Sequence, residues 1–363
     1  MRKIGIDARL YFQTGVGTYI KNLIHYLEDH NEDEYIFYLY VRKVDIEKIS
    51  IKKQNFKLIA VDAPWHSIKE QTIFLIKLIK DKLDLMHFTY FGYPIFYNRP
   101  FVATVHDLTP LNYKTGASST LSPILYKIKH FFLKIILKIQ IKFARYIFTP
   151  THYVKSQVLN KYGKDLNSKI IVTHEGLSYD LIDNTDDIAS LNLPAKYFLY
   201  VGNFYPHKNV ETLIRAFRHC RFKDTKLVLV GPNNLFSDEL NNNLSEKDRA
   251  NIIFLSNISN KLMPKIYSNA LALINPSFSE GFGLPIVEAI HFECPVIASH
   301  IPAFIEILGE NGNFFDPNDD LALADKMKNF NNKIVHLDNT FSFKHLTDKT
   351  FEIYQDVLTN ENR

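Results

Sequence analysis

Residues 272–289 read ALINPSFSEGFGLPIVEA, and this stretch decides the fold. A short apolar run, Ala272–Asn275, is followed by a loop with Gly281 and Gly283 and then by a helical pattern that begins with Leu-Pro. Proline is favoured in the first turn of a helix, and glycine frees the loop backbone. The stretch therefore predicts a strand, a tight loop and a helix, the repeating unit of a parallel α/β sheet.

The same alternation runs along nearly the whole chain, which predicts parallel sheets covered by helices on both faces. A polar segment at 179–193, rich in Asp, Asn and Ser, is the expected boundary between two doubly wound domains. The expected strands are Lys3–Asp7, Tyr35–Val41, Leu85–Phe88, Phe101–His106, Arg145–Thr149, Tyr197–Val201, Lys226–Val230, Ile252–Leu255, Ala272–Asn275 and Val296–Ala298. The expected helices include Thr18–Leu27, Ser67–Lys80, Asn209–Phe217, Lys261–Ser268 and Pro285–His291.

Composition agrees with an ordinary globular protein. The chain has 363 residues, 46% of them hydrophobic and 23% charged, which argues against wholesale disorder and suits two domains. Two cysteines cannot form a disulfide framework and match no zinc pattern, so we expect a reducing compartment. The first residues lack the apolar run of a signal peptide, and no stretch of 18 uncharged apolar residues occurs. We expect a cytosolic globular protein.

Charge is spread unevenly between the two halves. Residues 1–185 carry 26 Lys and Arg against 17 Asp and Glu, a net charge of +9, and the remainder carries −5. This asymmetry indicates either an anionic partner for the first half or random drift in surface charge. The segment 121–146 holds six basic residues, no acidic residue and many Ile, Leu and Phe. It is either a helix that docks on an anionic membrane or a helix packed into the core.

Two loops that follow predicted strands suit phosphate. Thr14-Gly15-Val16-Gly17-Thr18 opens a helix, which favours an anion site or simply a tight turn. It is not a dinucleotide fingerprint, because the third glycine position is Ile20. The second loop ends the strand at Gly202 and presents Lys208 before a helix that Asn209 is expected to cap. A positive charge at the start of a helix interacts unfavourably with the helix dipole, and a phosphate bound at this position would explain why a lysine is present. The alternative is a lysine that is exposed to solvent and binds nothing.

Three further side chains are candidates for chemistry. Glu280 lies in the loop and Glu288 one turn into the helix, so each could bind hydroxyls of one polyol ligand or cap the helix. His106 ends a predicted strand before Asp107, where a histidine is otherwise a capping or core residue.

These residues carry a family resemblance. The pattern Glu280-x7-Glu288 with Gly-Phe-Gly-Leu-Pro between resembles the signature of the glycosyltransferase group 1 family, retaining enzymes of the GT-B fold. The resemblance covers essentially the whole chain. Its other parts are Ile6–Arg9 with Thr14–Gly17, His106-Asp107-Leu108, Tyr200–Asn209, Pro295–Ala298 and the closing helix Phe341–Leu358.

The resemblance implies two Rossmann-like domains that face a central cleft. Residues 1–180, joined by a returning helix at 341–363, would bind the acceptor, and 181–340 the nucleotide-sugar donor. Many members have Arg after the glycine of the phosphate segment, where this chain has Asn203, so the phosphate grip rests on Lys208 and backbone amides. The implied catalytic residues are His106, Glu280 and Lys208. The implied donor-binding residues are Gly15, Gly17, Gly202, Asn203, Lys208, Gly281, Phe282, Gly283, Leu284 and Glu288.

The implied reaction is retaining sugar transfer to a glycan or lipid-linked acceptor in bacterial surface polysaccharide biosynthesis. It is thought in this family to proceed by front-face attack, and we favour GDP-mannose over UDP-sugars as donor. No Asp-x-Asp triplet occurs, so we expect no metal, and no cofactor because the nucleotide-sugar is a substrate. We expect no nucleic-acid partner and a cytoplasmic location, or a peripheral one at the inner face of the cytoplasmic membrane. The alternatives are a non-catalytic sugar-nucleotide-binding or scaffold protein and a sugar-nucleotide epimerase, whereas the broken glycine fingerprint disfavours a dehydrogenase.

Overall fold

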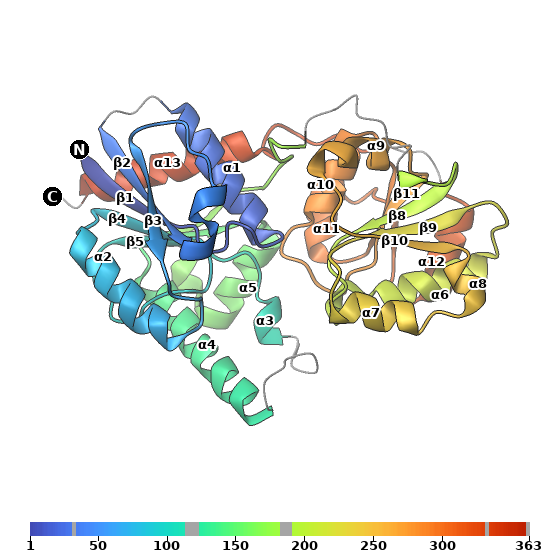
Figure 1. The fold of residues 1–363 in the computed structure, drawn as a ribbon, viewed down its shortest axis with the longest axis horizontal. Helices are drawn as coiled ribbons and strands as arrows, with labels where there is room; N and C mark the ends of the chain where they lie inside the picture. Colours follow the sequence, from blue (N-terminus) through green and yellow to red (C-terminus); the bar gives the residue numbers. More distant parts are fainter. Residues whose placement is uncertain (31–33, 113–122, 182–190, 331–333, 361–363) are drawn as a thin grey trace. The chain divides into compact units, whose positions relative to one another are not determined.

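The computed structural model describes residues 1–30, 34–112, 123–181, 191–330 and 334–360. These residues separate into two compact units (Figure 1). Of the described residues, unit 1 holds 1–30, 34–112, 123–175 and 342–360, and unit 2 holds 176–181, 191–330 and 334–341. Most of the predicted boundary at 179–193 lies at 182–190, outside the described residues.

Unit 1 is built on a seven-stranded sheet in which all paired strands run parallel, in the order β3-β2-β1-β4-β5-β6-β7. The strands are β1 Arg2–Asp7, β2 Tyr35–Arg42, β3 Phe56–Val61, β4 Leu85–Phe88, β5 Phe101–Thr104, β6 Ile147–Thr149 and β7 Ile170–Val172. The helices are α1 Val16–Asp29, α2 Leu75–Asp81, α3 Thr109–Asn112, α4 Pro123–Phe143, α5 His152–Tyr162 and α13 Phe343–Asn360.

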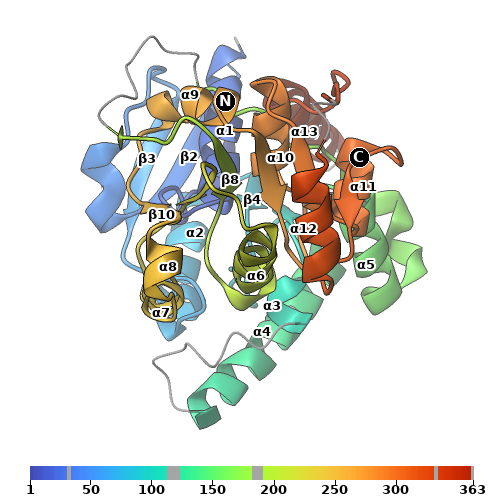
Figure 2. The same cartoon turned by 90° about the vertical axis from the view of Figure 1, so that its right-hand side faces the viewer.

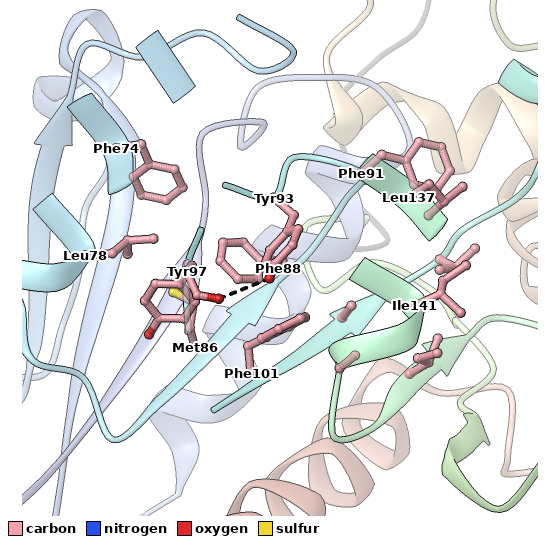
Figure 3. Packing of buried hydrophobic residues seen from close by; sticks show 14 of the residues in the cluster. Phe74, Leu78, Met86, Phe88, Phe91, Tyr93, Tyr97, Phe101, Leu137 and Ile141 are labelled. Atoms are coloured by element: carbon pink, nitrogen blue, oxygen red, sulfur yellow. Dashed lines mark hydrogen bonds between the residues drawn. The ribbon is translucent and has the colours of Figure 1, made fainter. Parts of the chain in front are cut away.

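The core of unit 1 is rich in aromatic side chains (Figure 3). The Tyr93 ring stacks on Phe101 at 4.8 Å and meets the edge of Phe88 at 5.4 Å. Its hydroxyl donates to the Tyr97 carbonyl oxygen at 3.0 Å, which satisfies the polar end of a buried ring. Strands β4 and β5 therefore contribute to a cluster of packed aromatic rings in the core of unit 1.

The last helix of the chain belongs to unit 1. α13 packs against α1, and the Tyr354 hydroxyl lies 2.5 Å from His87 Nδ1 on β4. The predicted return of the C-terminal helix to the first domain is confirmed.

Unit 2 contains a six-stranded sheet of parallel pairs in the order β10-β9-β8-β11-β12-β13. Helices α6 and α12 pack against each other beside it (Figure 2). The strands are β8 Tyr197–Val201, β9 Lys226–Val230, β10 Ile252–Leu255, β11 Ala272–Asn275, β12 Val296–Ser299 and β13 Phe314–Phe315. The helices are α6 Val210–Cys220, α7 Leu235–Asn242, α8 Glu246–Arg249, α9 Met263–Ser268, α10 Leu284–His291, α11 Pro302–Leu308 and α12 Asp320–Lys328.

The predicted class of two doubly wound parallel sheets is confirmed, with local corrections. Strand β5 ends at Thr104, so His106 lies beyond the strand, because the chain turns where Asp107 Oδ1 accepts from the Thr109 amide at 2.6 Å. The helix expected over Ser67–Lys80 is present over residues 68–81, but it contains a π-helical turn at Glu70–Phe74, where buried Glu70 accepts from Arg9. Strands β3, β7 and β13 were not predicted. Among the described residues, no helix has the length and apolarity needed to cross a bilayer.

Candidate active site

The carboxyl ends of β8 and β11 bring Lys208 and Glu280 together in unit 2. Lys208 Nζ donates to Glu280 Oε1 at 2.6 Å, and the two side chains are only 19% and 15% exposed. Parallel strands place the loops that follow them at one edge of the sheet, which is where open α/β sheets bind ligands. A cation and a carboxylate therefore share a sheltered position at the ligand-binding edge.

Two polar side chains support this ion pair. Ser277 Oγ lies 2.8 Å from Glu280 Oε1 and 2.9 Å from Asn275 Oδ1, and both Ser277 and Asn275 are buried. Lys208 is thus not the solvated lysine that the sequence left open. Glu280 is not a capping residue either, because α10 has Gly283 at its cap position and no side-chain cap.

Glu288 has a separate partner within unit 2. The Tyr267 hydroxyl on α9 donates to Glu288 Oε2 at 2.6 Å. Burial disfavours the charged carboxylate and raises the pKa of Glu288 to about 7, although the tyrosine hydrogen bond opposes the shift. This carboxyl group therefore titrates near neutral pH, and its role is not that of a helix cap.

The raised pKa of Glu288 predicts a pH-dependent stability. Between the unfolded value near 4.5 and about 7, the folded protein holds one more proton than the unfolded chain, so stability falls as pH rises across this range. Glu288→Gln is never charged and can still accept from Tyr267. We expect the variant to exceed wild type in stability by up to about 3 kcal/mol at pH 8 and to match it near pH 4.5.

Thermal melting at the two pH values tests this expectation. Glu310→Gln, at an exposed position, is the matched control and should shift the melting temperature at neither pH. An equal shift for Glu288→Gln at pH 4.5 and pH 8 would contradict the account.

The remaining predicted residues of the loop 281–284 lie at the start of α10. Gly283 has φ 141°, and a Cβ there would lie 2.9 Å from the Phe304 ring, so this position requires glycine. Phe282 is buried, with its ring 6.2 Å from that of Phe341, and Leu284 is the first residue of the helix. The sequence of the loop thus fixes where α10 begins, at Leu284, four residues after Glu280.

The phosphate-type loop differs from expectation at its end. Asn209 occupies the cap position of α6 but has a left-handed backbone, φ 58°, and its side chain makes no cap hydrogen bond. At the start of the loop, the carbonyl oxygen of Asn203 accepts from the Tyr200 hydroxyl, next to Gly202. The predicted cap is therefore wrong, because the Asn209 amide is used elsewhere.

In unit 1, the predicted glycine loop leads into α1. Gly15 stands at the cap position of that helix, and a Cβ on Gly17 would lie 2.6 Å from the Tyr11 carbonyl oxygen, so only glycine fits there. Two residues later, the ring of Tyr19 packs edge-on against His106 at 4.8 Å. The helix that begins at the glycine loop therefore contacts His106 through the Tyr19 ring.

His106 is held by two groups of unit 1. Its Nε2 lies 3.0 Å from the Thr89 carbonyl oxygen, which can only accept, so this nitrogen carries a hydrogen. Its Nδ1 lies 3.4 Å from Glu175 Oε1, and an ion pair forms when the ring is protonated. Only 9% of the residue is exposed.

The structure therefore sorts the predicted residues into two sets. Gly15, Gly17 and His106 belong to unit 1 and the others to unit 2. The sequence did not predict the residues that contact these site residues, because a contact such as that of Tyr267 with Glu288 depends on the tertiary fold. Within either unit, the described residues bring no three His, Cys, Asp or Glu side chains close enough to share a metal ion. The missed partners are Tyr19, Glu175, Tyr267, Asn275 and Ser277.

Comparison with known proteins gives a consistent family. The model for glycosyl transferases group 1 matches residues 182–334, and the model for glycosyltransferase family 4 matches residues 13–181. O-antigen chain mannosyltransferase RfbU of Salmonella typhimurium is 28% identical over 259 residues, which are 67% of this chain and 71% of that protein. O-antigen chain mannosyltransferase B of Escherichia coli is 28% identical over half of each chain.

Solved structures show the same fold. Sucrose-phosphate synthase from Thermosynechococcus elongatus superimposes with a TM-score of 0.78 at 19% identity and covers 99% of this chain and 100% of that one. HepE from Anabaena in complex with UDP and glucose gives a TM-score of 0.74 at 16% identity and covers 98% and 100%. The fold is GT-B. Both halves of the chain match, and it belongs to the group 1/family 4 glycosyltransferases, a family of retaining enzymes.

Proposed function

We propose that this glycosyltransferase transfers mannose from GDP-mannose to a glycan or lipid-linked acceptor of a bacterial surface polysaccharide. The observation that carries the proposal is the 2.6 Å contact between Lys208 and Glu280, a cation for a diphosphate beside a carboxylate for sugar hydroxyls. The choice of mannose rests on relatives whose names describe O-antigen mannosyltransferases. UDP-sugars are the second donor class, since HepE was solved with UDP and glucose.

The residues of unit 2 provide positioning and charge. When the bond between the sugar C1 and the diphosphate oxygen breaks, the electron pair leaves with the nucleoside diphosphate, and Lys208 stabilises that charge. The acceptor hydroxyl bonds to C1 on the same face, and its proton passes to the leaving phosphate oxygen. Glu280 holds sugar hydroxyls, and Glu288 holds the ribose.

We assign the donor to residues 181–340, whose loops also supply Gly202, Asn203 and 281–284. The acceptor is assigned to residues 1–180 together with the helix at 341–363. In this assignment, Gly15 and Gly17 offer backbone amides to phosphate, and His106, held by Thr89 and Glu175, faces the transferred sugar. The net positive charge of the first half favours an anionic acceptor such as a lipid diphosphate.

Nucleotide release from a donor panel tests the function. We expect GDP release from GDP-mannose that depends on a lipid-linked saccharide and produces a longer saccharide by mass spectrometry. The rate should be the same in EDTA, because Lys208 and backbone amides neutralise the diphosphate without a metal.

The other outcomes contradict the proposal in distinct ways. Binding of nucleotide-sugars without release of nucleotide by any donor would favour a scaffold protein. Conversion of the donor sugar to its epimer would indicate an epimerase. Activity that is lost in EDTA and restored by a divalent cation would exclude the metal-independent mechanism.

Helix α4 supports a further part of the proposal, docking on an anionic membrane. One face of the helix packs into the core through Leu137 and Ile141 (Figure 3). Its amino-terminal end projects away from the rest of unit 1 (Figures 1 and 2). Near the middle of the helix, Phe131 and Phe132 are 61% and 55% exposed. One face of the helix therefore agrees with the interpretation of 121–146 as a core helix, and the exposed face agrees with the interpretation as a membrane-docking helix. The exposed basic residues beside them are Lys127, Lys129, Lys134, Lys138 and Lys142.

Vesicle flotation tests the docking. We expect the protein to float with vesicles that contain phosphatidylglycerol at low salt, and to lose this binding at high salt or with neutral vesicles, because each basic residue near the surface adds about 1 kcal/mol. Phe131→Ser with Phe132→Ser should weaken binding, whereas Phe96→Ser, at another exposed phenylalanine of unit 1, should not. Equal flotation with both vesicle types would overturn the proposal.

A further inference from the structure

Asn209 is a buried polar residue in an uncommon backbone conformation. It is 3% exposed, and its φ of 58° and ψ of 35° lie in the left-handed region. Asparagine tolerates this region better than other residues with a Cβ, yet its side chain gives the helix no cap. Because buried polar groups are normally hydrogen-bonded, the side-chain amide of Asn209 is expected to bond to groups other than the helix start.

The side-chain amide of Asn209 ties three loops together. Nδ2 donates to the carbonyl oxygen of Pro276 at 3.0 Å and to that of Pro317 at 2.8 Å. Oδ1 accepts from the Thr212 hydroxyl at 2.6 Å, so both amide hydrogens and the oxygen are paired. Pro276 follows β11 and Pro317 follows β13, while Asn209 itself ends the loop after β8.

The hydrogen bonds of Asn209 involve residues next to the ion pair of Lys208 and Glu280. Lys208 directly precedes Asn209 in the chain. On the other side, Pro276 directly precedes Ser277, whose hydroxyl contacts Glu280. A backbone hydrogen bond from the Phe278 amide to the His207 carbonyl oxygen, at 2.8 Å, joins the same two loops. The position of Lys208 relative to Glu280 therefore depends on the loop contacts that Asn209 organises.

We propose that Asn209 is a positioning residue of the donor site, which holds Lys208 and Glu280 at the separation that a sugar diphosphate requires. The proposal rests on the donor-binding role given to unit 2 above. Asn209 would act through Lys208 and Glu280 rather than on the substrate, because its hydrogen-bonding groups are already paired with protein atoms.

The test uses Asn209→Gly, because glycine adopts a positive φ readily and the variant removes only the amide contacts. We expect the donor KM to rise and kcat to fall, together about tenfold in kcat/KM, for protein that remains folded by circular dichroism. The matched control is Asn251→Gly. Asn251 also donates to a carbonyl, that of Lys247 at 2.9 Å, and accepts from a lysine, Lys226, but it precedes β10 at the opposite edge of the sheet. The control should leave both constants unchanged.

A double-mutant cycle separates positioning from a structural role. Because Asn209 acts through Lys208, Lys208→Met should weaken GDP or UDP binding, measured by calorimetry, much less in the Asn209→Gly background than in wild type. Additive losses, or a lower melting temperature with unchanged kcat and KM, would overturn the proposal. If wild type releases no nucleotide from any donor, the proposed function fails, while the binding cycle still decides the role of Asn209.

Discussion

Lys208→Met should lower kcat/KM for the donor by about 100- to 1000-fold, the effect of removing a group that stabilises charge in a transition state. Methionine keeps the length and apolar character of the side chain but cannot neutralise the leaving diphosphate. Lys208→Arg should recover part of the loss, because it keeps the charge but not the compact geometry of the ammonium. Steady-state nucleotide release gives both constants.

Lys226→Met is the matched control for this prediction. Lys226 is also a lysine of unit 2 with protein partners, the Ala250 carbonyl oxygen at 2.8 Å and Asn251 Oδ1 at 2.9 Å, but it begins β9 at the opposite edge of the sheet. Its replacement should leave kcat/KM unchanged. Full activity of Lys208→Met with every donor would remove the central argument for the proposed function.

Glu280→Gln should lower kcat by about 10- to 100-fold and change the donor KM little. The sugar ring changes charge and geometry as its bond breaks, so a carboxylate that holds its hydroxyls contributes most in the transition state. Glutamine keeps the shape of the side chain and can still accept from Ser277, which limits disruption of the loop.

Glu288→Gln is the internal comparison. The ribose does not change during the reaction, so at pH 8, where the Glu288 carboxyl group is mostly charged, loss of that charge should raise the donor KM and leave kcat close to wild type. A similar split for both variants, or a KM effect for Glu280→Gln alone, would contradict the assignment of the two carboxylates to sugar and ribose.

Much of the fold could be predicted because its inner strands are continuous apolar runs. β4, β8, β9 and β11 have the predicted bounds, since strands covered on both faces leave little choice of residue. β10 also has the predicted bounds, although it is an outermost strand of the second sheet, because it too is a continuous apolar run. The missed strands are outer ones. β3 and β7 are the outermost strands of the first sheet and β13 of the second, and they are partly exposed or only two or three residues long. Their apolar pattern is therefore weak.

For the candidate site, the sequence predicted several of the residues but not the contacts between them. Residue type and spacing identified Lys208, Glu280 and Glu288, and their roles stay predictions. The sequence could not indicate that Lys208 contacts Glu280, because they are 72 residues apart and meet only where two strands end side by side. The use of the Asn209 amide was hidden for the same reason, since an asparagine before a helix predicts a cap.

The place of α13 in unit 1 has a consequence for how the protein is made. The described residues of unit 2 all lie between Gly176 and Phe341, whereas unit 1 needs residues from both sides of that range. Buried contacts such as Tyr354 with His87, and the bond from Arg2 to the Leu358 carbonyl oxygen, cannot form on the ribosome until unit 2 has been synthesised. During translation, the apolar surface of α1 that α13 covers therefore stays uncovered until the whole of unit 2 has been synthesised, and exposed apolar surface of this kind favours aggregation.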